Sequence, residues 1–342
     1  MSGPHDDPES GPWSVEEVRG LLAGYGRRPR ALAVAALAGG IENLNLRVDA
    51  DGELLVLRRY DATAPAEVPW ELELLRRLVA RRFPTAPPIA RPDGALLSTF
   101  ADRPAALFAY VPGRHPAPDD PRAAAQAADA VARLHELTEG LALPHPRTRM
   151  DSRRRLARFR TWLEARGPRP NEAALARLAA EVEAYTAELD ARLGPRAGAL
   201  PRGAIHHDAH ADNILVDEAG RLVALLDFDD AHEAFLLGDL AVLLEAWGSE
   251  PASHALAPER TGVVLRAYRA RRPLGEAEFE LLPDFLALYS LADSVQYVAD
   301  HVESGMPAER AAADCNQYAR FRAWTARPGW RDRLRASLAG AK

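Results

Sequence analysis

Hydrophobic and polar positions change period several times in the first third of the chain. Residues 14–24 begin with a Ser-x-x-Glu capping box and continue with apolar residues at helical spacing, which predicts a helix ending at glycine. Two β-like runs, 40–50 and 52–61, flank an Asp-Gly pair and predict a hairpin. Residues 69–82 have the pattern of an amphipathic helix. Two short apolar runs follow, at 94–101 and 104–111.

The remainder of the chain has mainly the helical period. One strand-rich stretch, 205–229, interrupts it. The helices are expected at 121–137, 151–166, 171–192, 238–247, 259–271, 276–302 and 307–325. The two parts of the chain therefore differ in their predicted secondary structure.

These patterns predict an α+β protein with two lobes. The small N-terminal lobe, 13–111, has an antiparallel sheet plus a helix, and the larger C-terminal lobe, 112–342, is mainly helical. A Pro-Gly pair at 112–113 is the expected hinge. Residues 1–12 are predicted to be a disordered tail. A cleft between two lobes is a favoured place for a small ligand.

Composition narrows the class of protein. The 342 residues are 47% hydrophobic and 27% charged, which is ordinary for globular proteins. The net charge of −6 argues against a nucleic-acid partner. The tail lacks the features of a signal peptide and no apolar run is long enough for a membrane span, so we expect a cytoplasmic protein without a membrane partner.

Two residue types limit the possible chemistry. The single cysteine, Cys315, excludes an intrachain disulfide and a zinc-cysteine site, and its Ala-rich surroundings predict a buried residue in a helix. Lys342 is the only lysine. Any mechanism that needs an internal lysine must therefore use arginine in this chain.

The stretch AIHHDAHADNILVD at 204–217 is the densest group of chemically active side chains, and three interpretations are open. On a strand, His206, Asp208, His210 and Asp212 would share one face, as metal ligands of a hydrolase do. A solvated polar loop without chemistry is the second interpretation. The third is the catalytic loop of a kinase.

The kinase interpretation requires three side chains, and the sequence contains them. Asp208 is the carboxylate that orients the attacking hydroxyl and takes its proton, and Asn213, five residues later, is a Mg²⁺ ligand. A predicted hairpin then leads to Asp227, the second Mg²⁺ ligand, with Asp229 as its support. The hairpin predicts that Asp227 folds back beside Asn213.

At these residues the chain resembles the aminoglycoside phosphotransferase and choline kinase superfamily, which has a protein-kinase-like fold. The resemblance rests on HHDAHADNIL at 206–215, LDFDDA at 226–231, GDLA at 238–241 and VARLHEL at 131–137. GGIENLNLRV at 39–48 and DRPAALFAYVPGR at 102–114 look most like type II homoserine kinases. The match extends over roughly 14–300, and His207 stands where the family usually has glycine.

The resemblance implies a nucleotide site in the N-terminal lobe. Arg58 takes the strand position at which many kinases have a phosphate-binding lysine, and Glu71 is its expected partner, with Glu73 as the rival. Arg59 faces the opposite side of the strand. The other nucleotide-binding candidates are the loop over the phosphates, Gly39, Gly40, Asn43 and Asn45, and the adenine-binding strand, Ala109, Tyr110 and Val111.

The resemblance also implies roles in the C-terminal lobe. His206, His210, Asp229 and Asp239 are expected to support the catalytic loop and the metal. Carboxylates near the acceptor, Asp230 and Glu233 among them, favour an acceptor that carries an amine. An acceptor with a carboxylate would in addition need an arginine, which the sequence does not identify.

The resulting expectation is a kinase that transfers the γ-phosphoryl group of ATP, or of GTP, to a hydroxyl with the help of Mg²⁺. The acceptor is a small amine-bearing metabolite, either a homoserine-like amino acid or an amino alcohol. An aminoglycoside-type antibiotic is the alternative acceptor. A pseudokinase, which binds without turnover, is the alternative of another class. The sequence does not indicate an oligomeric state.

Overall fold

The computed structural model describes residues 13–37, 43–143, 151–167, 172–250 and 255–339. The described residues form two compact units. Unit 1 consists of the chain up to Gly113, Leu143 and Val223–Asp229, and unit 2 consists of Arg114–Ala142, the described residues from 151 to 222, and the chain from Asp230 onward. The predicted tail, 1–12, lies outside the described residues. The predicted division into a nucleotide-binding and an acceptor-binding lobe stays a prediction.

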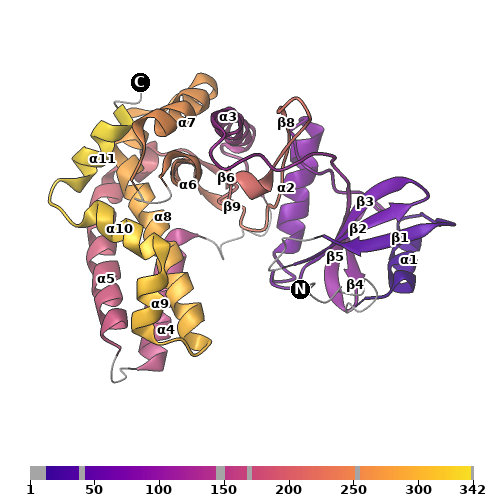
Figure 1. Cartoon of the computed structure of the whole chain (residues 1–342), viewed down its shortest axis with the longest axis horizontal. Helices are drawn as coiled ribbons and strands as arrows, with labels where there is room; N and C mark the ends of the chain where they lie inside the picture. The colour runs from indigo at the N-terminus through magenta and orange to yellow at the C-terminus, as the bar shows by residue number, and fades with distance from the viewer. Residues whose placement is uncertain (1–12, 38–42, 144–150, 168–171, 251–254, 340–342) are drawn as a thin grey trace, which may run out of the picture. The chain divides into compact units, whose positions relative to one another are not determined.

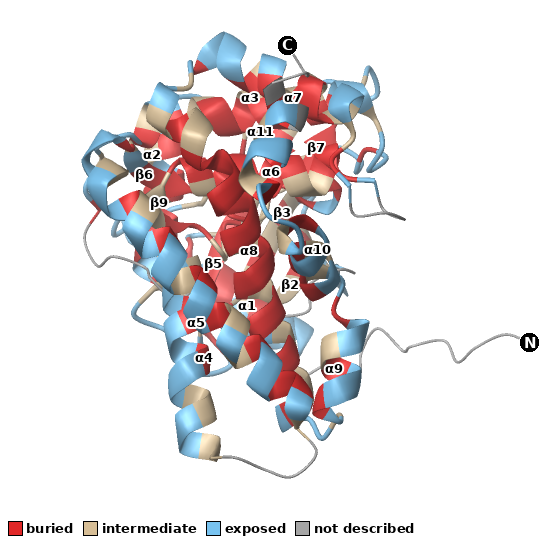
Figure 2. Cartoon of the chain, turned by 90° about the vertical axis from the view of Figure 1, so that its left-hand side faces the viewer, coloured by how far each residue is buried: buried red, intermediate tan, exposed pale blue. Residues whose placement is uncertain are grey.

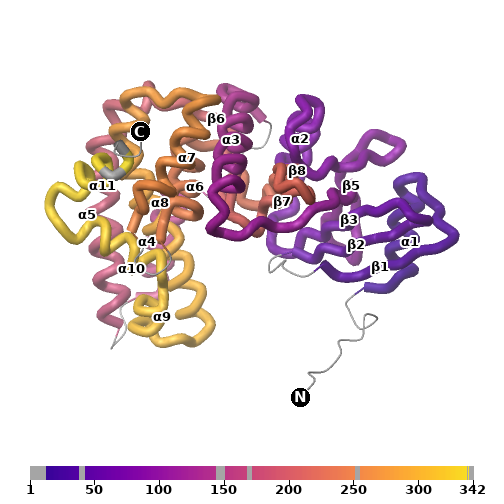
Figure 3. Tube along the Cα trace, turned by 45° about the horizontal axis from the view of Figure 1, so that its top comes forward, coloured from indigo at the N-terminus to yellow at the C-terminus, as the bar shows by residue number. Residues whose placement is uncertain are grey.

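Unit 1 contains an antiparallel sheet of five strands in the order β1-β2-β3-β5-β4, of which Figure 3 labels β1, β2, β3 and β5. Its elements are α1 (Val15–Gly24), β1 (Leu32–Ala36), β2 (Leu44–Ala50), β3 (Glu53–Arg59), α2 (Val68–Ala80), β4 (Leu97–Phe100) and β5 (Arg103–Ala109), as Figure 1 labels them. One face of the sheet and α1 share an apolar core that includes Val18, Leu22, Leu46 and Leu57.

The turn between β2 and β3 confirms the predicted hairpin. Asp51 and Gly52 have φ of 54° and 89°, and the Gly52 amide donates to Asp49 Oδ1 at 2.8 Å. Both residue types tolerate this left-handed backbone, which explains the tight connection. The hairpin sets the register that pairs Arg58 with Asn45.

Unit 2 is mainly helical, and a small two-stranded sheet, β6 (Arg202–Ile205) with β9 (His232–Phe235), flanks the stretch at 206–213. Strand β7 (Ile214–Val216) follows that stretch, and β8 (Leu222–Leu225) leads from unit 2 into the Val223–Asp229 segment of unit 1. The helices are α3 (Pro121–Thr138), α4 (Ser152–Arg166), α5 (Ala173–Leu193), α6 (Leu237–Gly248), α7 (Pro258–Arg271), α8 (Glu276–Glu303), α9 (Ala308–Asp314), α10 (Asn316–Thr325) and α11 (Trp330–Ala339), with 3₁₀ turns at Gly194–Ala199 and Ala211–Asn213.

Helix α8 forms the centre of unit 2. Figure 2 shows it buried along much of its length, and its buried residues include Leu282, Leu286 and Val295. It packs against α4, α6 and α10. A helix that is apolar on several sides is expected to be buried in this way.

The α+β fold, with an antiparallel sheet in the N-terminal part and a mainly helical C-terminal part, is confirmed. The single helix expected at 307–325 is wrong, because the chain leaves helical geometry at Cys315, where ψ is 105°. Cys315 is buried, as expected, but between two helices. No helix within the described ranges has both the length and the apolar character needed to cross a membrane.

Candidate active site

In unit 1, Arg58 on β3 is the centre of a polar network. Its Nε donates to Asn45 Oδ1 at 2.9 Å, and its Nη1 donates to Asp229 Oδ1 at 3.0 Å and Asp227 Oδ1 at 3.2 Å. Glu71 Oε1 lies 3.8 Å from the same Nη1. Arg58 and Asn45, which the sequence predicts to bind the phosphates, therefore lie together with Asp227 within unit 1.

The electrostatics of this network favour a cation. Burial would lower the pKa of Arg58, but the charges of Asp229 and Asp227 outweigh burial and raise that pKa well above its ordinary value. Three carboxylates lie around this one guanidinium. Their negative charges favour the positive charge at this position.

Glu71, and not Glu73, lies beside Arg58. Glu71 is fully buried on α2 and accepts a hydrogen bond from the Tyr60 hydroxyl at 3.1 Å. Glu73 forms ion pairs with Arg76 and Arg77 of its own helix, and these pairs lower its pKa to about 2. The geometry thus distinguishes the two candidates that the sequence left open.

The predicted phosphate loop lies only partly within the described residues. Gly39 and Gly40 fall outside them. Asn43 is buried, its Oδ1 accepts from the Asp61 amide at 2.9 Å, and its Nδ2 donates to Asp229. Asn43 therefore braces the carboxylates of the network.

The predicted adenine-binding strand is partly engaged within unit 1. The Ala109 amide donates to the Pro87 carbonyl at 2.9 Å, and the Tyr110 amide donates to the Leu54 carbonyl at 3.2 Å. A nucleotide base cannot accept from these two amides while they are paired. Of the three candidates on this strand, Val111 is the one for which an amide contact to adenine stays a prediction.

In unit 2, Asp208 is held by the residues that follow it. Asn213 Nδ2 donates to both the backbone oxygen and Oδ2 of Asp208, at 2.9 and 2.8 Å. His210 Nε2 lies 3.3 Å from the same Oδ2. The Asp208 side chain is 35% exposed, so its carboxylate is fixed in orientation and still accessible. Because Asn213 donates with its amide nitrogen, its amide oxygen is the atom that can bind a cation.

Asp239, the first polar residue of α6, holds the start of this loop. It is fully buried and accepts from the amides of His206 and His207 at 2.7 and 2.6 Å. His135 Nε2 lies 2.9 Å from Asp239, and His135 Nδ1 lies 2.7 Å from the Tyr268 hydroxyl. Burial would raise the pKa of Asp239, but the hydrogen bond and charge of His135 outweigh it and lower that pKa.

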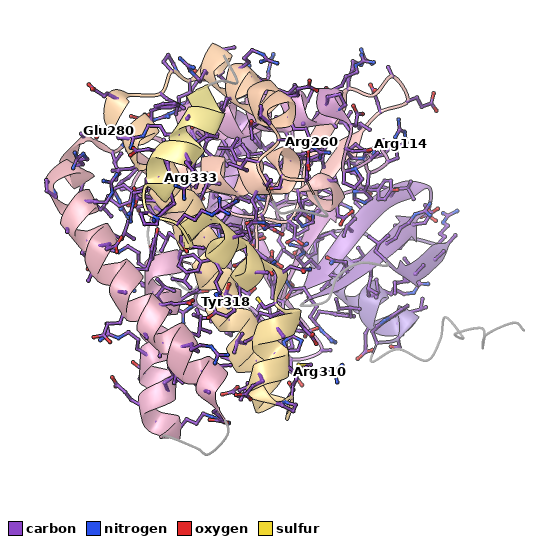
Figure 4. All side chains as sticks on the ribbon, turned by 60° about the vertical axis from the view of Figure 1, so that its left-hand side comes forward. Arg114, Arg260, Glu280, Arg310, Tyr318 and Arg333 are labelled. Carbon is purple, nitrogen blue, oxygen red and sulfur yellow. The ribbon has the colours of Figure 1, made fainter. Side chains whose placement is uncertain are left out.

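A second support reaches the loop from α6 and α7. Trp247 Nε1 donates to the Ala209 carbonyl at 2.8 Å. Arg260, labelled in Figure 4, donates through Nε to the Trp247 carbonyl at 3.0 Å. His206 Nδ1 accepts from the Asp208 amide at 3.2 Å. Helices from distant parts of the chain thus hold the short loop that contains Asp208.

The metal-hydrolase interpretation receives no support from this geometry. His206, Asp208 and His210 lie in a loop, not along one face of a strand. Within the described ranges, no group of three or more His, Cys, Asp or Glu side chains could hold a metal ion. The loop instead presents one carboxylate and one carboxamide.

Several polar residues near the loop were not identified from the sequence. Arg155 on α4 donates to Asp293 on α8 at 2.5 Å, and its Nη2 lies 3.9 Å from Asp230. Burial raises the pKa of Asp293, which the charge of Arg155 opposes. Asp230 therefore forms a charged group in unit 2 together with Arg155 and Asp293. Glu233 lies on β9 opposite Ala204, and its predicted acceptor role stays a prediction.

His207 has a backbone φ of 68°, which favours glycine and costs a histidine roughly 1–2 kcal/mol. Its ring is buried against His232 and Tyr289, with centroids 5.0 and 5.3 Å away. Burial, followed by the nearby His232, lowers the pKa of His207 well below 6.5. His207 is therefore neutral at pH 7.

This shift predicts a pH-dependent stability. The unfolded chain binds a proton on His207 at a higher pH than the folded chain does, so the free energy of unfolding should fall as the pH drops below about 6.5. Thermal unfolding measured from pH 8 to 5 checks this. The dependence of the unfolding temperature on pH should be smaller in the His207→Gly variant, because glycine adopts the same φ without strain. Equal slopes would show that His207 is not the group that titrates.

Comparisons with known proteins identify the family of this chain. The phosphotransferase enzyme family matches residues 33–276. The homoserine kinase of Rhodospirillum rubrum is 35% identical over 272 residues, which cover 79% of this chain and 81% of the relative. The homoserine kinase of Acidiphilium cryptum is 35% identical over 261 residues, 74% of this chain and 76% of the relative.

Two solved structures share the fold. Amicoumacin kinase hAmiN, in complex with AMP-PNP, Ca²⁺ and Ami, has a TM-score of 0.67 at 17% identity and covers 94% of each chain. A microcompartment-associated aminopropanol kinase has a TM-score of 0.59 at 18% identity, and the match covers 96% of this chain and 100% of the kinase. The predicted protein-kinase-like fold is thus confirmed. The chain belongs to the phosphotransferase enzyme family and is a small-molecule kinase.

Proposed function

We propose that the protein transfers the γ-phosphoryl group of ATP, or of GTP, to a hydroxyl of a small amine-bearing metabolite, either a homoserine-like amino acid or an amino alcohol. The observation that carries the proposal is the Asp208 carboxylate, accessible and fixed in orientation by Asn213 and His210. The curated relatives, which are homoserine kinases, support a metabolic acceptor over an antibiotic.

In this proposal each side chain acts within its own unit. Asp208 accepts the hydrogen bond of the acceptor hydroxyl, orients its oxygen and takes its proton late in the transfer. Arg58 binds phosphate oxygens through its guanidinium, and Glu71 and Asn45 hold it in place. Loss of solvent and correct placement then supply most of the rate enhancement.

Asn213 in unit 2 and Asp227 in unit 1 each present an oxygen of the kind that Mg²⁺ prefers, because carboxylate and carboxamide oxygens suit this hard cation. When bound, the ion neutralises charge on the phosphates. Asn213 is braced by Asp208, and Asp227 is held by Arg58 in unit 1. Asp229, which pairs with Arg58 and Asn43, supports Asp227.

In unit 2, the carboxylates of Asp230 and Asp293 both lie near the buried guanidinium of Arg155, so two negative groups face one positive group there. Burial raises the pKa of Tyr289 well above its ordinary value, and the charges of Asp293 and Asp208 add to that rise, which shows that these carboxylates act on the same part of unit 2. An ammonium group on the acceptor would compensate the excess.

The test is a screen for ADP release with ATP and Mg²⁺, in which mass spectrometry confirms each phosphorylated product. The panel contains L-homoserine, ethanolamine, choline, hydroxylysine and an aminoglycoside. We expect phosphorylation of at least one amine-bearing small alcohol. ATP binding without any phosphorylated product across the panel would contradict the proposal and support a pseudokinase.

Arg58 should matter for nucleotide use far more than its neighbour. Arg58→Ala removes the cation that pairs with Glu71, Asp227 and Asp229, so we expect the KM for ATP to rise at least about tenfold. Arg59→Ala is the matched control, because Arg59 pairs with Asp61, and its KM should stay within about twofold of wild type. Equal effects of the two changes would mean that Arg58 does not bind phosphate.

A further inference from the structure

Unit 2 contains a cavity of about 410 Å³ beside the catalytic loop. It lies among α4, α5, α8 and the β6-β9 sheet, and its lining includes His207, the residue directly before Asp208. Pockets that hold small organic ligands occupy about 300–1,000 Å³. The volume corresponds to on the order of a dozen water-sized volumes of about 30 Å³ each, more than the short chain of homoserine or ethanolamine fills.

The walls of the cavity are mainly apolar and aromatic. Phe235 of β9 and Phe285 of α8 meet edge to face, with centroids 6.0 Å apart, and Leu189 and Leu288 complete this side. His232 lies on the same strand as Phe235, and burial lowers its pKa below the ordinary value. Both histidines of the lining are therefore uncharged at pH 7.

The charged residues of the lining have partners of their own. Arg153 pairs with Asp190, and the Arg202 guanidinium lies 4.5 Å from the centre of the Phe235 ring. Asp151 caps α4 and accepts from the Arg154 amide at 2.9 Å. The apolar wall of the cavity, Phe235, Phe285, Leu189 and Leu288, offers no polar partner, so a carboxylate or a polycation placed against it would lose its hydration without compensation.

One residue of α8, Tyr289, lies next to both the cavity and the carboxylates of Asp208 and Asp293. Tyr289 lines the cavity, contacts His207 edge-on, and lies within the electrostatic reach of Asp208 and Asp293. A ligand with its hydroxyl at Asp208 and its amine near these carboxylates would place the rest of its body in the cavity. The Ser152 hydroxyl, 3.4 Å from His207 Nε2, is a hydrogen-bonding group on the wall near the loop.

We propose that this cavity houses an uncharged apolar body of the acceptor, so that the preferred substrate is an amino alcohol with an aryl or branched alkyl substituent. The inference rests on the proposed function and narrows its substrate class. It disfavours a compact zwitterionic amino acid and a polycationic aminoglycoside as the best acceptors. Each buried methylene group should raise kcat/KM about fourfold until the cavity is full.

The test compares alcohols that differ only in that body. Ethanolamine, leucinol and phenylalaninol have the amine and the hydroxyl on adjacent carbons, and L-homoserine has a carboxylate and one more methylene group between its amine-bearing carbon and its hydroxyl. With ATP and Mg²⁺ we expect kcat/KM to rise from ethanolamine to leucinol to phenylalaninol, with homoserine below leucinol. A maximum at ethanolamine or homoserine would overturn the inference and leave the proposed kinase activity standing.

A pair of variants on α4 tests the cavity itself. Ala157 is exposed and lines the cavity, whereas Ala165 is exposed on the same helix outside the lining. Ala157→Trp should lower kcat/KM for phenylalaninol at least tenfold and leave ethanolamine and the KM for ATP within twofold. Ala165→Trp should leave all three unchanged. An equal effect of Ala157→Trp on both alcohols, or none on either, would overturn the inference.

A measurement of alcohol binding tests this inference independently of the proposed function. Phenylalaninol should raise the thermal unfolding temperature of the wild type more than ethanolamine does, and Ala157→Trp should abolish the difference. If no alcohol is phosphorylated, the proposed function fails, and the thermal shift still decides whether the cavity takes the apolar body. No difference between the two alcohols in the wild type would show that it does not.

Discussion

Asp208→Asn should lower kcat for phosphate transfer by about 10²–10⁴-fold, the range that a positioned general base contributes. The carboxylate accepts from Asn213 and lies beside His210, so its remaining lone pairs point to the exposed side of the loop, where an acceptor hydroxyl can be oriented. A carboxamide of the same shape keeps the packing but accepts a proton far more weakly. ATP binding, which the proposal bases on other residues, should survive.

A matched control lies in the same loop. Asp212 is 86% exposed and reaches only the outer nitrogen of His210, at 3.7 Å. Asp212→Asn should therefore keep kcat within about twofold of wild type. The measurements are initial rates at saturating ATP and acceptor, with isothermal titration of a non-hydrolysable ATP analogue. If Asp208→Asn turns over at a rate similar to Asp212→Asn, Asp208 is not the base.

The parts of the site that the sequence predicted well are local. Asn213 reaches Asp208 because a 3₁₀ turn at Ala211–Asn213 brings residues five apart together, and the motif spacing encodes that turn. The β2-β3 hairpin is also local, and its Asp-Gly turn fixes the strand position of Arg58. Short-range hydrogen bonds and turn residues leave a readable pattern in a single sequence.

The parts that the sequence missed depend on distant contacts. Burial of His135 against Asp239 and Tyr268 joins three helices, and no spacing rule predicts such a contact. Neither does any pattern show that the Ala109 amide is used by the Pro87 carbonyl. The break at Cys315 lies in an Ala-rich stretch whose pattern is compatible with a continuous helix. Tertiary packing decides each of these cases.

The choice between Glu71 and Glu73 illustrates the same limit. Both glutamates open the same amphipathic helix, and only the fold shows that Glu71 faces the buried Tyr60 while Glu73 pairs with Arg76 and Arg77. Helical periodicity gives the faces of a helix but not which face lies against the sheet. The identity of the acceptor is harder still, because it depends on a cavity built from four elements.

Asp239→Asn should have the second large effect, although Asp239 is expected to position the loop without touching the substrate. Its two oxygens accept from the amides of His206 and His207, and a carboxamide would turn an N–H group toward one of those donors. Breaking a buried charged network typically costs about 3–5 kcal/mol. The free energy of unfolding should fall by that amount, as measured by urea denaturation.

The same change should also lower kcat, since a displacement of about 1 Å in a catalytic group can cost about 10²-fold. Tyr268→Phe provides the graded comparison. It removes the far hydrogen bond to His135 and the one that Arg272 Nη1 donates to the same hydroxyl at 3.3 Å, so stability should fall by about 1–3 kcal/mol and kcat should stay near wild type. A purely structural role for Asp239 would leave kcat unchanged in the folded fraction, at a temperature well below the unfolding midpoint. A loss of kcat there, with the KM for ATP unchanged, would show that this buried carboxylate sets the position of Asp208.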